Sequence, residues 1–135
     1  MSTLPTPAPT VTTSNATFWA ATAEGKFLLQ RCSSCSTIVW FPRAHCPTCW
    51  TETLSTFEAN GSGTVYSFTI VRKGRNVYSE SAPFVIAYVE LAEGPRIMTN
   101  IVDCDPESVH IGMKVRMVFH DTGQGNALYR FVPHS

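Results

Sequence analysis

The sequence predicts a mainly β protein made of a leading helix, a four-cysteine zinc ribbon and a C-terminal β-barrel or sandwich. Four of its five cysteines stand in two C-x2-C pairs separated by ten residues, which is a spacing typical of structural zinc sites. From residue 61 onward, short apolar segments alternate with Gly and Pro turns, as in small all-β folds. The chain has 135 residues, of which 44% are hydrophobic, so it can bury a core.

The first 31 residues divide into a tail and a helical segment. Residues 1–13 carry three Pro and five Thr with few groups to bury, so we expect a flexible N-terminal tail. Ser14 or Asn15 can cap a helix, and Gly25 can end it. We place a leading helical segment at residues 14–31, although residues 26–31 (KFLLQR) fit a strand equally well.

Residues 32–54 are predicted to form the zinc ribbon. Two residues between a pair of cysteines allow one tight turn to direct both sulfurs at a single point. Two such turns facing each other make a tetrahedral cage that suits Zn²⁺ and leaves no position open for water or substrate. We therefore expect a structural zinc ion with four thiolate ligands: Cys32, Cys35, Cys46 and Cys49.

Other interpretations of these cysteines stay open. A rubredoxin-like iron site or redox-active C-x-x-C motifs would use the same residues, and the sequence does not decide between zinc and iron. Many such turns have Gly after the second cysteine, where a positive φ is convenient, but Ser36 and Trp50 stand there. His45 is interpreted as a solvated loop residue. Cys104 is interpreted as a core cysteine, because no base is paired with it.

Residues 55–135 are predicted to form the barrel. Their apolar segments are rich in β-branched and aromatic residues and are separated by Gly- and Pro-containing turns. The expected strands are residues 64–71, 84–91, 96–102, 114–120 and 127–132. The polar loop at 72–81 holds the densest basic cluster of the chain.

Charge and hydropathy exclude several classes of protein. Ten basic and ten acidic side chains cancel, so the chain has no overall attraction for phosphate backbones and no nucleic-acid partner is expected. No apolar stretch approaches the ~20 residues of a membrane helix. The N-terminus lacks the basic start and apolar core of a signal peptide. We therefore expect a cytoplasmic protein without membrane contact.

An ordered series of short motifs resembles the acyl-CoA-associated zinc-ribbon/OB-fold protein family. The resemblance covers about residues 14–133, and the series is more specific than the cysteines alone. The matching elements are Phe18-Trp19, residues 29–32 (LQRC), 41–43 (FPR), 46–49 (CPTC), 61–69 (GSGTVYSFT), 83–91 (PFVIAYVEL), 93–96 (EGPR) and 111–115 (IGMKV).

The resemblance implies an N-terminal helix, a rubredoxin-like zinc ribbon and a C-terminal OB-fold barrel. The resemblance also implies a role. Members of the family that this chain resembles are usually small non-catalytic partners of thiolase-like enzymes, including lipid-transfer-type thiolases and steroid side-chain aldolases. Some are paired with MaoC-like hydratases. The expected assembly is a hetero-oligomer in lipid or steroid metabolism, in which this chain stabilises the enzyme and helps bind or channel acyl-CoA.

Five residues are candidates for contact with acyl-CoA or with the partner. Arg72, Lys73 and Arg75 could meet the phosphates of CoA or an acidic surface. Phe18 and Trp19 are adjacent on the expected helix, so we expect only one of them to face the core. The other could anchor a partner. The purely structural alternatives are a solvated loop and two core aromatics.

Two other functions fit parts of the sequence. A zinc ribbon beside an OB fold also suits a nucleic-acid-binding module, but the neutral charge opposes it. A stand-alone enzyme acting on acyl-CoA would need a catalytic constellation. The sequence offers no nucleophile–base pair, and a closed four-cysteine site has no open position.

Overall fold

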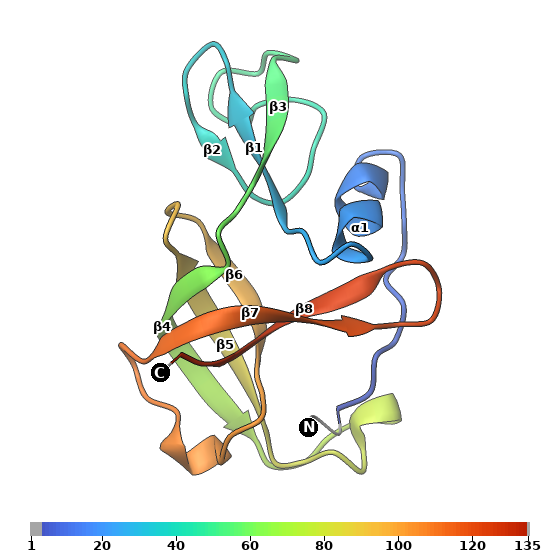
Figure 1. Cartoon of the computed structure of the whole chain (residues 1–135), viewed down its shortest axis with the longest axis vertical. Helices are drawn as coiled ribbons and strands as arrows, with labels where there is room; N and C mark the ends of the chain where they lie inside the picture. The colour runs from blue at the N-terminus through green and yellow to red at the C-terminus, as the bar shows by residue number, and fades with distance from the viewer. Residues whose placement is uncertain (1–3, 135) are drawn as a thin grey trace.

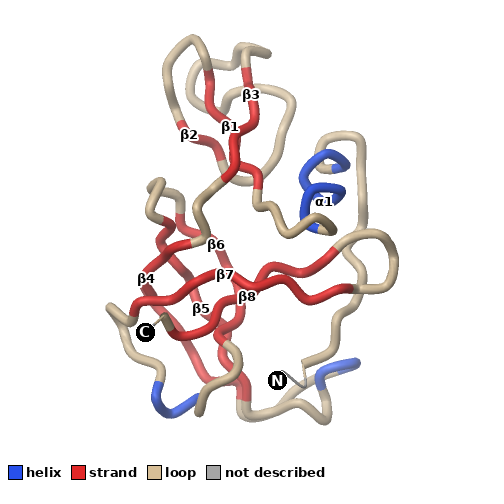
Figure 2. Tube along the Cα trace, in the orientation of Figure 1, coloured by secondary structure: helices blue, strands red, loops and turns tan. Residues whose placement is uncertain are grey.

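The computed structural model describes residues 4–134 of the chain. Figure 1 shows a small ribbon sheet at one end, a barrel at the other and a short helix beside their junction. Figure 2 shows that strands dominate both parts. The predicted fold class, with a helix, a four-cysteine ribbon and a barrel, is confirmed. Within residues 4–134, no helix is long and apolar enough to cross a membrane.

Helix α1 spans Ala16–Thr22 and is shorter than expected. Asn15 fixes the approach of the chain, because its side-chain oxygen accepts from the Thr12 amide at 2.7 Å and its side-chain nitrogen donates to the Thr10 carbonyl at 3.3 Å. The backbone then turns at Gly25, which has φ +75°, a conformation that glycine adopts without steric cost. The helix therefore ends at Thr22, three residues before the glycine that was expected to end it.

The ribbon sheet has the order β2-β1-β3, with β1 at Leu28–Cys32, β2 at Ile38–Val39 and β3 at Leu54–Glu58. The expected helical segment at residues 14–31 is therefore wrong over its last part. β1 is the central strand, and its backbone groups are paired on both sides, with Leu28 opposite Glu58 and Gln30 opposite Val39. Because β3 pairs along all of β1, the ribbon also extends past the predicted boundary at residue 54.

The barrel closes in the order β4-β5-β6-β8-β7. Its strands are β4 at Ser62–Val71, β5 at Phe84–Leu91, β6 at Arg96–Ile101, β7 at Lys114–Asp121 and β8 at Ala127–Pro133. Two 3-10 helices, η1 at Asn76–Tyr78 and η2 at Pro106–Ser108, lie in the connections. β6 and β8 pair in parallel at one position, Ile101 opposite Phe131. The barrel therefore has a seam where the rest of these two strands diverges.

The inward-facing side chains of the barrel are buried apolar residues, among them Val65, Val89, Ile97 and Phe131. Gly63 lies on the same inner face, where an added Cβ would come within 2.4 Å of the Val89 Cγ1 and 3.2 Å of the Glu90 carbonyl oxygen. Only a residue without a side chain fits at this position.

Gly63→Ala is expected to lower the free energy of unfolding by about 1–3 kcal/mol, because a packed core must shift to admit the methyl group. Urea unfolding monitored by fluorescence measures this change. Ser67→Ala on the exposed part of the same strand is the control, and we expect it to change stability by less than about 0.5 kcal/mol. Equal stability of the two variants would show that the barrel interior accommodates a side chain at residue 63.

The N-terminal segment follows a defined path. Residues 1–3 of the predicted flexible tail lie outside the described residues. Residues 4–13 run along the side of the barrel from the region of η1 to α1 (Figure 1). The Pro5 carbonyl accepts a hydrogen bond of 2.6 Å from the Arg130 guanidinium in β8, which attaches this segment to the barrel.

Candidate metal centre and ligand groove

The two cysteine pairs form matching turns. In each turn the amide after the second cysteine donates to the carbonyl of the first: Ser36 to Cys32 and Trp50 to Cys46, both at 2.8 Å. The amides of Cys32 and Cys46 in turn donate to the carbonyls five residues ahead, both at 2.9 Å. Ser36 and Trp50 have φ values of +63° and +67°, so both turns require the positive φ that glycine would provide more easily.

The four thiol sulfurs lie within 4.8 Å of one another. Cys32 and Cys49 are 3.5 Å apart, Cys35 and Cys46 are 3.6 Å apart, and all four cysteines are free of disulfides. A tetrahedron of Zn–S bonds of about 2.3 Å places its sulfurs about 3.8 Å apart. The donor set, the spacing and the closed geometry therefore fit a structural Zn²⁺ ion.

Hydroxyl and amide groups surround the sulfurs. Thr53, Thr51 and Thr37 place their hydroxyl oxygens 3.2, 3.0 and 3.1 Å from the sulfurs of Cys32, Cys49 and Cys35, and the Thr48 amide donates to the Cys46 sulfur at 3.4 Å. Such donors stabilise thiolates.

The same donors prepare the site for a cation. Hydrogen bonds from Thr53 and then Thr51 lower the pKa of Cys32 to about 5, and backbone donors around Cys46 lower its pKa as well. At Cys35 the Thr37 hydroxyl lowers the pKa, but burial and the neighbouring sulfurs outweigh it and the net pKa is raised. Four crowded thiolates thus require a positive ion to coexist.

His45 and Cys104 stand outside this cage. The His45 ring nitrogen lies 2.9 Å from the Glu52 carboxylate, with both side chains more than half exposed, which agrees with a solvated loop residue. Cys104 is half-buried and packs against the barrel core. Burial raises the pKa of its thiol, so this thiol is less reactive than a free one.

The structure separates the basic cluster into two groups. Arg72 forms an ion pair of 2.7 Å with Glu107 of η2. Lys73 and Arg75 instead line a cavity of about 590 Å³ between their loop and the outer surface of β5 and β6. The other lining residues are mostly apolar or uncharged: Val71, Gly74, Asn76, Tyr78, Phe84, Ile86, Met98, Thr99 and Asn100.

The resulting groove has cations at one rim and an apolar wall. Because β5 and β6 are the second and third strands of the barrel, the groove lies on the face that OB folds commonly use for ligands.

A second cavity of about 200 Å³ lies at the seam between β6 and β8. It shares four lining residues with the first: Tyr78, Met98, Thr99 and Asn100. Arg130 lines it and is 1% exposed. Arg130 was not among the residues predicted from the sequence. The sequence did offer an indication. Leu128, Arg130 and Val132 are two residues apart in an apolar strand, so the charged side chain shares a face with apolar ones.

Both Phe18 and Trp19 are buried, at 3% and 6% exposure, so the expectation that two adjacent aromatics cannot share one core is wrong. Adjacent helical residues point about 100° apart, and α1 has neighbours on more than one side. Phe18 packs edge-on against Phe27 and Trp40, with ring centroids 5.1 and 5.3 Å away. Trp19 stacks on Tyr129 of β8 at 6.1 Å. These rings join the ribbon, helix and barrel and do not form an exposed anchor.

Models of protein families match both halves of the chain. The ChsH2 rubredoxin-like zinc ribbon domain matches residues 19–55, and the ChsH2 C-terminal OB-fold domain matches residues 57–120. A DUF35 domain-containing scaffold protein of Methanocaldococcus jannaschii is 39% identical over 110 residues, covering 76% of this chain and 78% of that protein. The chain belongs to the ChsH2/DUF35 family. Its four-cysteine site is therefore that of a zinc ribbon.

Two further matches are to parts of enzymes. A probable enoyl-CoA hydratase alpha subunit of Thermomonospora curvata is 37% identical over 109 residues; the match covers 81% of this chain and 34% of that longer protein. A chain of the Ltp2-ChsH2(DUF35) aldolase superposes with a TM-score of 0.83 and 32% identity, covering 93% of this chain and 98% of the other. Sequences similar to this chain thus occur within a protein named a probable enoyl-CoA hydratase alpha subunit, and its fold occurs in a structure named Ltp2-ChsH2(DUF35) aldolase.

Proposed function

We propose that this chain is a non-catalytic accessory subunit that docks on a thiolase-like or hydratase-like enzyme of acyl-CoA metabolism and stabilises it. The observation that carries the proposal is the likeness, over nearly the full length of both chains, to a chain of the structure named Ltp2-ChsH2(DUF35) aldolase. The naming of a similar archaeal protein as a scaffold agrees with it. A role in lipid or steroid degradation rests on the family resemblance and stays a prediction.

The metal centre supports a structural role. Four sulfurs enclose the site, so a metal held by them has no free position for water or substrate. The ion would hold together a ribbon whose sheet has one five-residue central strand and a two-residue edge strand. A sheet this small depends on the metal for most of its stability.

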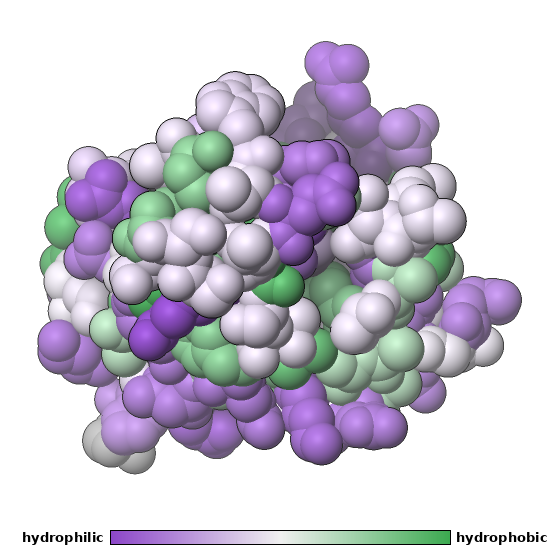
Figure 3. All heavy atoms as spheres, turned by 90° about the horizontal axis from the view of Figure 1, so that it is seen from above, coloured by the Kyte–Doolittle hydropathy of each residue, from purple (hydrophilic) through white to green (hydrophobic). Residues whose placement is uncertain are grey.

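The ribbon also offers a docking surface. Trp50 is 76% exposed and stands directly after the last cysteine, and Phe41 is 39% exposed at the start of the same β2–β3 connection. Seen from the ribbon end, near-neutral and apolar residues occupy much of the centre of this face, with hydrophilic ones mostly around them (Figure 3). A large exposed tryptophan held by a rigid turn is the kind of residue that carries binding energy in protein interfaces.

The groove beneath the β4–β5 loop supports contact with acyl-CoA. Its volume of about 590 Å³ is in the range of small-molecule sites. Lys73 and Arg75 would meet the phosphates of CoA, and the apolar wall at Phe84, Ile86 and Met98 would take the pantetheine or the acyl chain.

Lys73→Ala combined with Arg75→Ala is expected to weaken the binding of free coenzyme A about tenfold or more, because each lost cation removes a charge-assisted contact. Titration calorimetry measures the affinity for coenzyme A. The affinity of the unmodified chain should also fall as salt screens its charges. Arg72→Ala is the matched control, since Arg72 is paired with Glu107 and does not line the cavity. Equal affinity of the double variant and the control for coenzyme A would show that CoA does not bind in this groove.

The nucleic-acid alternative is disfavoured at one exposed aromatic of the barrel, Tyr66. Strand-binding barrels offer free ring faces on which bases stack. The Tyr66 ring is covered by the Arg96 guanidinium at 3.9 Å from its centroid, and Arg96 is in turn paired with Glu90 at 3.2 Å. A gel-shift with single-stranded DNA at moderate salt tests this alternative, and we expect no retarded band.

A further inference from the structure

Arg130 is a buried cation whose contacts are neutral. Its guanidinium lies 2.9 Å from the His120 Nδ1 and donates to the Pro5 carbonyl at 2.6 Å; Tyr78 is close enough to act on the pKa of Arg130. Among residues 4–134, no carboxylate forms an ion pair with it. Buried charges in proteins are ordinarily paired with an opposite charge, so this arrangement is electrostatically incomplete.

The His120 ring, which contacts Arg130, does not supply the missing charge. Burial and then Arg130 lower the pKa of His120, although Asp103 acts in the opposite direction, so the ring is a neutral acceptor at neutral pH. Burial also lowers the pKa of Arg130 itself, while Tyr78 opposes that shift. An arginine nevertheless stays protonated in a protein, and its positive charge remains in the seam.

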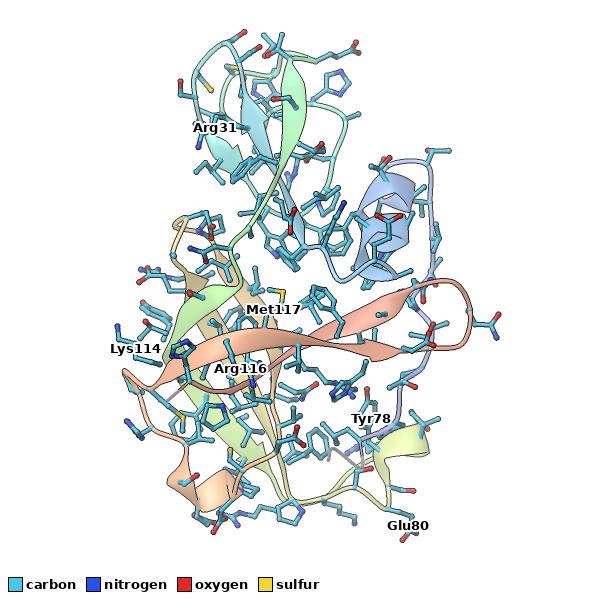
Figure 4. All side chains as sticks on the ribbon, in the orientation of Figure 1. Arg31, Tyr78, Glu80, Lys114, Arg116 and Met117 are labelled. Carbon is cyan, nitrogen blue, oxygen red and sulfur yellow. The ribbon has the colours of Figure 1, made fainter. Side chains whose placement is uncertain are left out.

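The cavity beside Arg130 offers apolar surface next to the buried cation. Its volume is about 200 Å³, and Trp19, Leu128, Met98 and Tyr129 contribute apolar surface to it. Four of its lining residues also line the larger groove, so the two cavities are neighbours. Tyr78, which lines both cavities, lies beside the N-terminal segment in Figure 4. A short apolar acid could therefore place its carboxylate at Arg130 and its chain against the apolar lining of this cavity.

We propose that the cavity beside Arg130 binds the carboxylate of an apolar organic acid, and that the Pro5 carbonyl occupies the place of this carboxylate until the ligand displaces the N-terminal segment. A carboxylate matches the planar fork of a guanidinium and brings the single negative charge that one buried cation lacks. A phosphate would bring more charge than this seam can neutralise. This site goes beyond the proposed function, and it requires neither Lys73 nor Arg75.

The competing explanation is that Arg130 only fastens the N-terminal segment to the barrel. The two explanations predict different results for a chain that lacks residues 1–9. This truncation deletes Pro5 but keeps Thr10, Thr12 and Asn15, which hold the start of α1. If Arg130 only attaches the N-terminal segment, the truncated chain loses a stabilising contact and does not bind the acid more tightly. If it is a ligand site, the truncated chain binds the acid more tightly.

Titration of the full chain with sodium octanoate, with octan-1-ol as the neutral match, tests the proposal. We expect octanoate to bind, octanol to bind much more weakly, and removal of residues 1–9 to raise octanoate affinity about tenfold, because a competing acceptor on a charged donor is lost. Arg130→Gln should abolish the preference for octanoate.

The combined Lys73→Ala and Arg75→Ala variant, which tests CoA binding, should leave octanoate affinity unchanged, so the two proposals can fail separately. Octanol binding as well as octanoate, or a truncation that leaves octanoate affinity unchanged or lower, would overturn the proposal. These two comparisons use the native side chain of Arg130 and decide the matter even if Arg130→Gln does not fold.

Discussion

Cys46→Ser is expected to release zinc and unfold the ribbon over residues 28–58 while the barrel stays folded. Cys46 is fully buried, its sulfur lies 3.6 Å from that of Cys35, and it accepts from the Thr48 amide. Zinc binding in comparable peptides contributes about 10–16 kcal/mol, which acts as folding free energy. Metal analysis should fall from one zinc per chain toward none, and limited proteolysis should cut the ribbon first.

Cys104→Ser is the matched control for this experiment. Cys104 is half-buried against the barrel and lies outside the group of four sulfurs. We expect it to retain a full zinc content and to lose only the small free energy of a partly buried thiol, about 1 kcal/mol. A Cys46→Ser protein that keeps both its zinc and its resistance to protease would refute the structural role of the metal.

Trp50→Ala is expected to weaken binding of the partner enzyme about 30-fold or more, because a large aromatic anchor is worth about 2 kcal/mol or more when it is buried in an interface. In the isolated chain the Trp50 side chain is mostly in solvent, so stability should change by less than about 0.5 kcal/mol. Surface plasmon resonance with the purified partner measures the first effect, and thermal unfolding measures the second.

Val77→Ala serves as the control surface. Val77 is 60% exposed and lies in η1, at the far end of the barrel from the ribbon (Figure 1). We expect it to leave affinity for the partner unchanged. Equal affinity of the Trp50 and Val77 variants for the partner would mean that the ribbon surface at Trp50 is not the docking surface. The accessory role would then require docking through another face.

The metal centre could be predicted from the sequence because its geometry is local. Each C-x2-C turn is closed by its own backbone hydrogen bonds, and the positive φ at Ser36 and Trp50 is part of the same local geometry. The strands of the barrel were also predictable, since their apolar residues recur between Gly and Pro turns.

The wrong predictions concern contacts between distant segments. Phe18 and Trp19 are buried by Trp40 of the ribbon and Tyr129 of the last strand, which no property of the helix itself indicates. Residues 28–31 became a strand because two other strands pair with them. Arg72 differs from Lys73 and Arg75 only because Glu107 lies within reach of it. Tertiary context decides such cases over local preference.

The most direct test of the accessory role is capture of the tagged protein at native expression levels from its own cells, with identification and quantification of what is bound. If this chain is an accessory subunit, a thiolase-like or hydratase-like enzyme subunit is recovered in near-equal amount, and this recovery falls for Trp50→Ala but not for Val77→Ala. Recovery of nucleic-acid machinery alone, or of no protein in comparable amount, would contradict the accessory role.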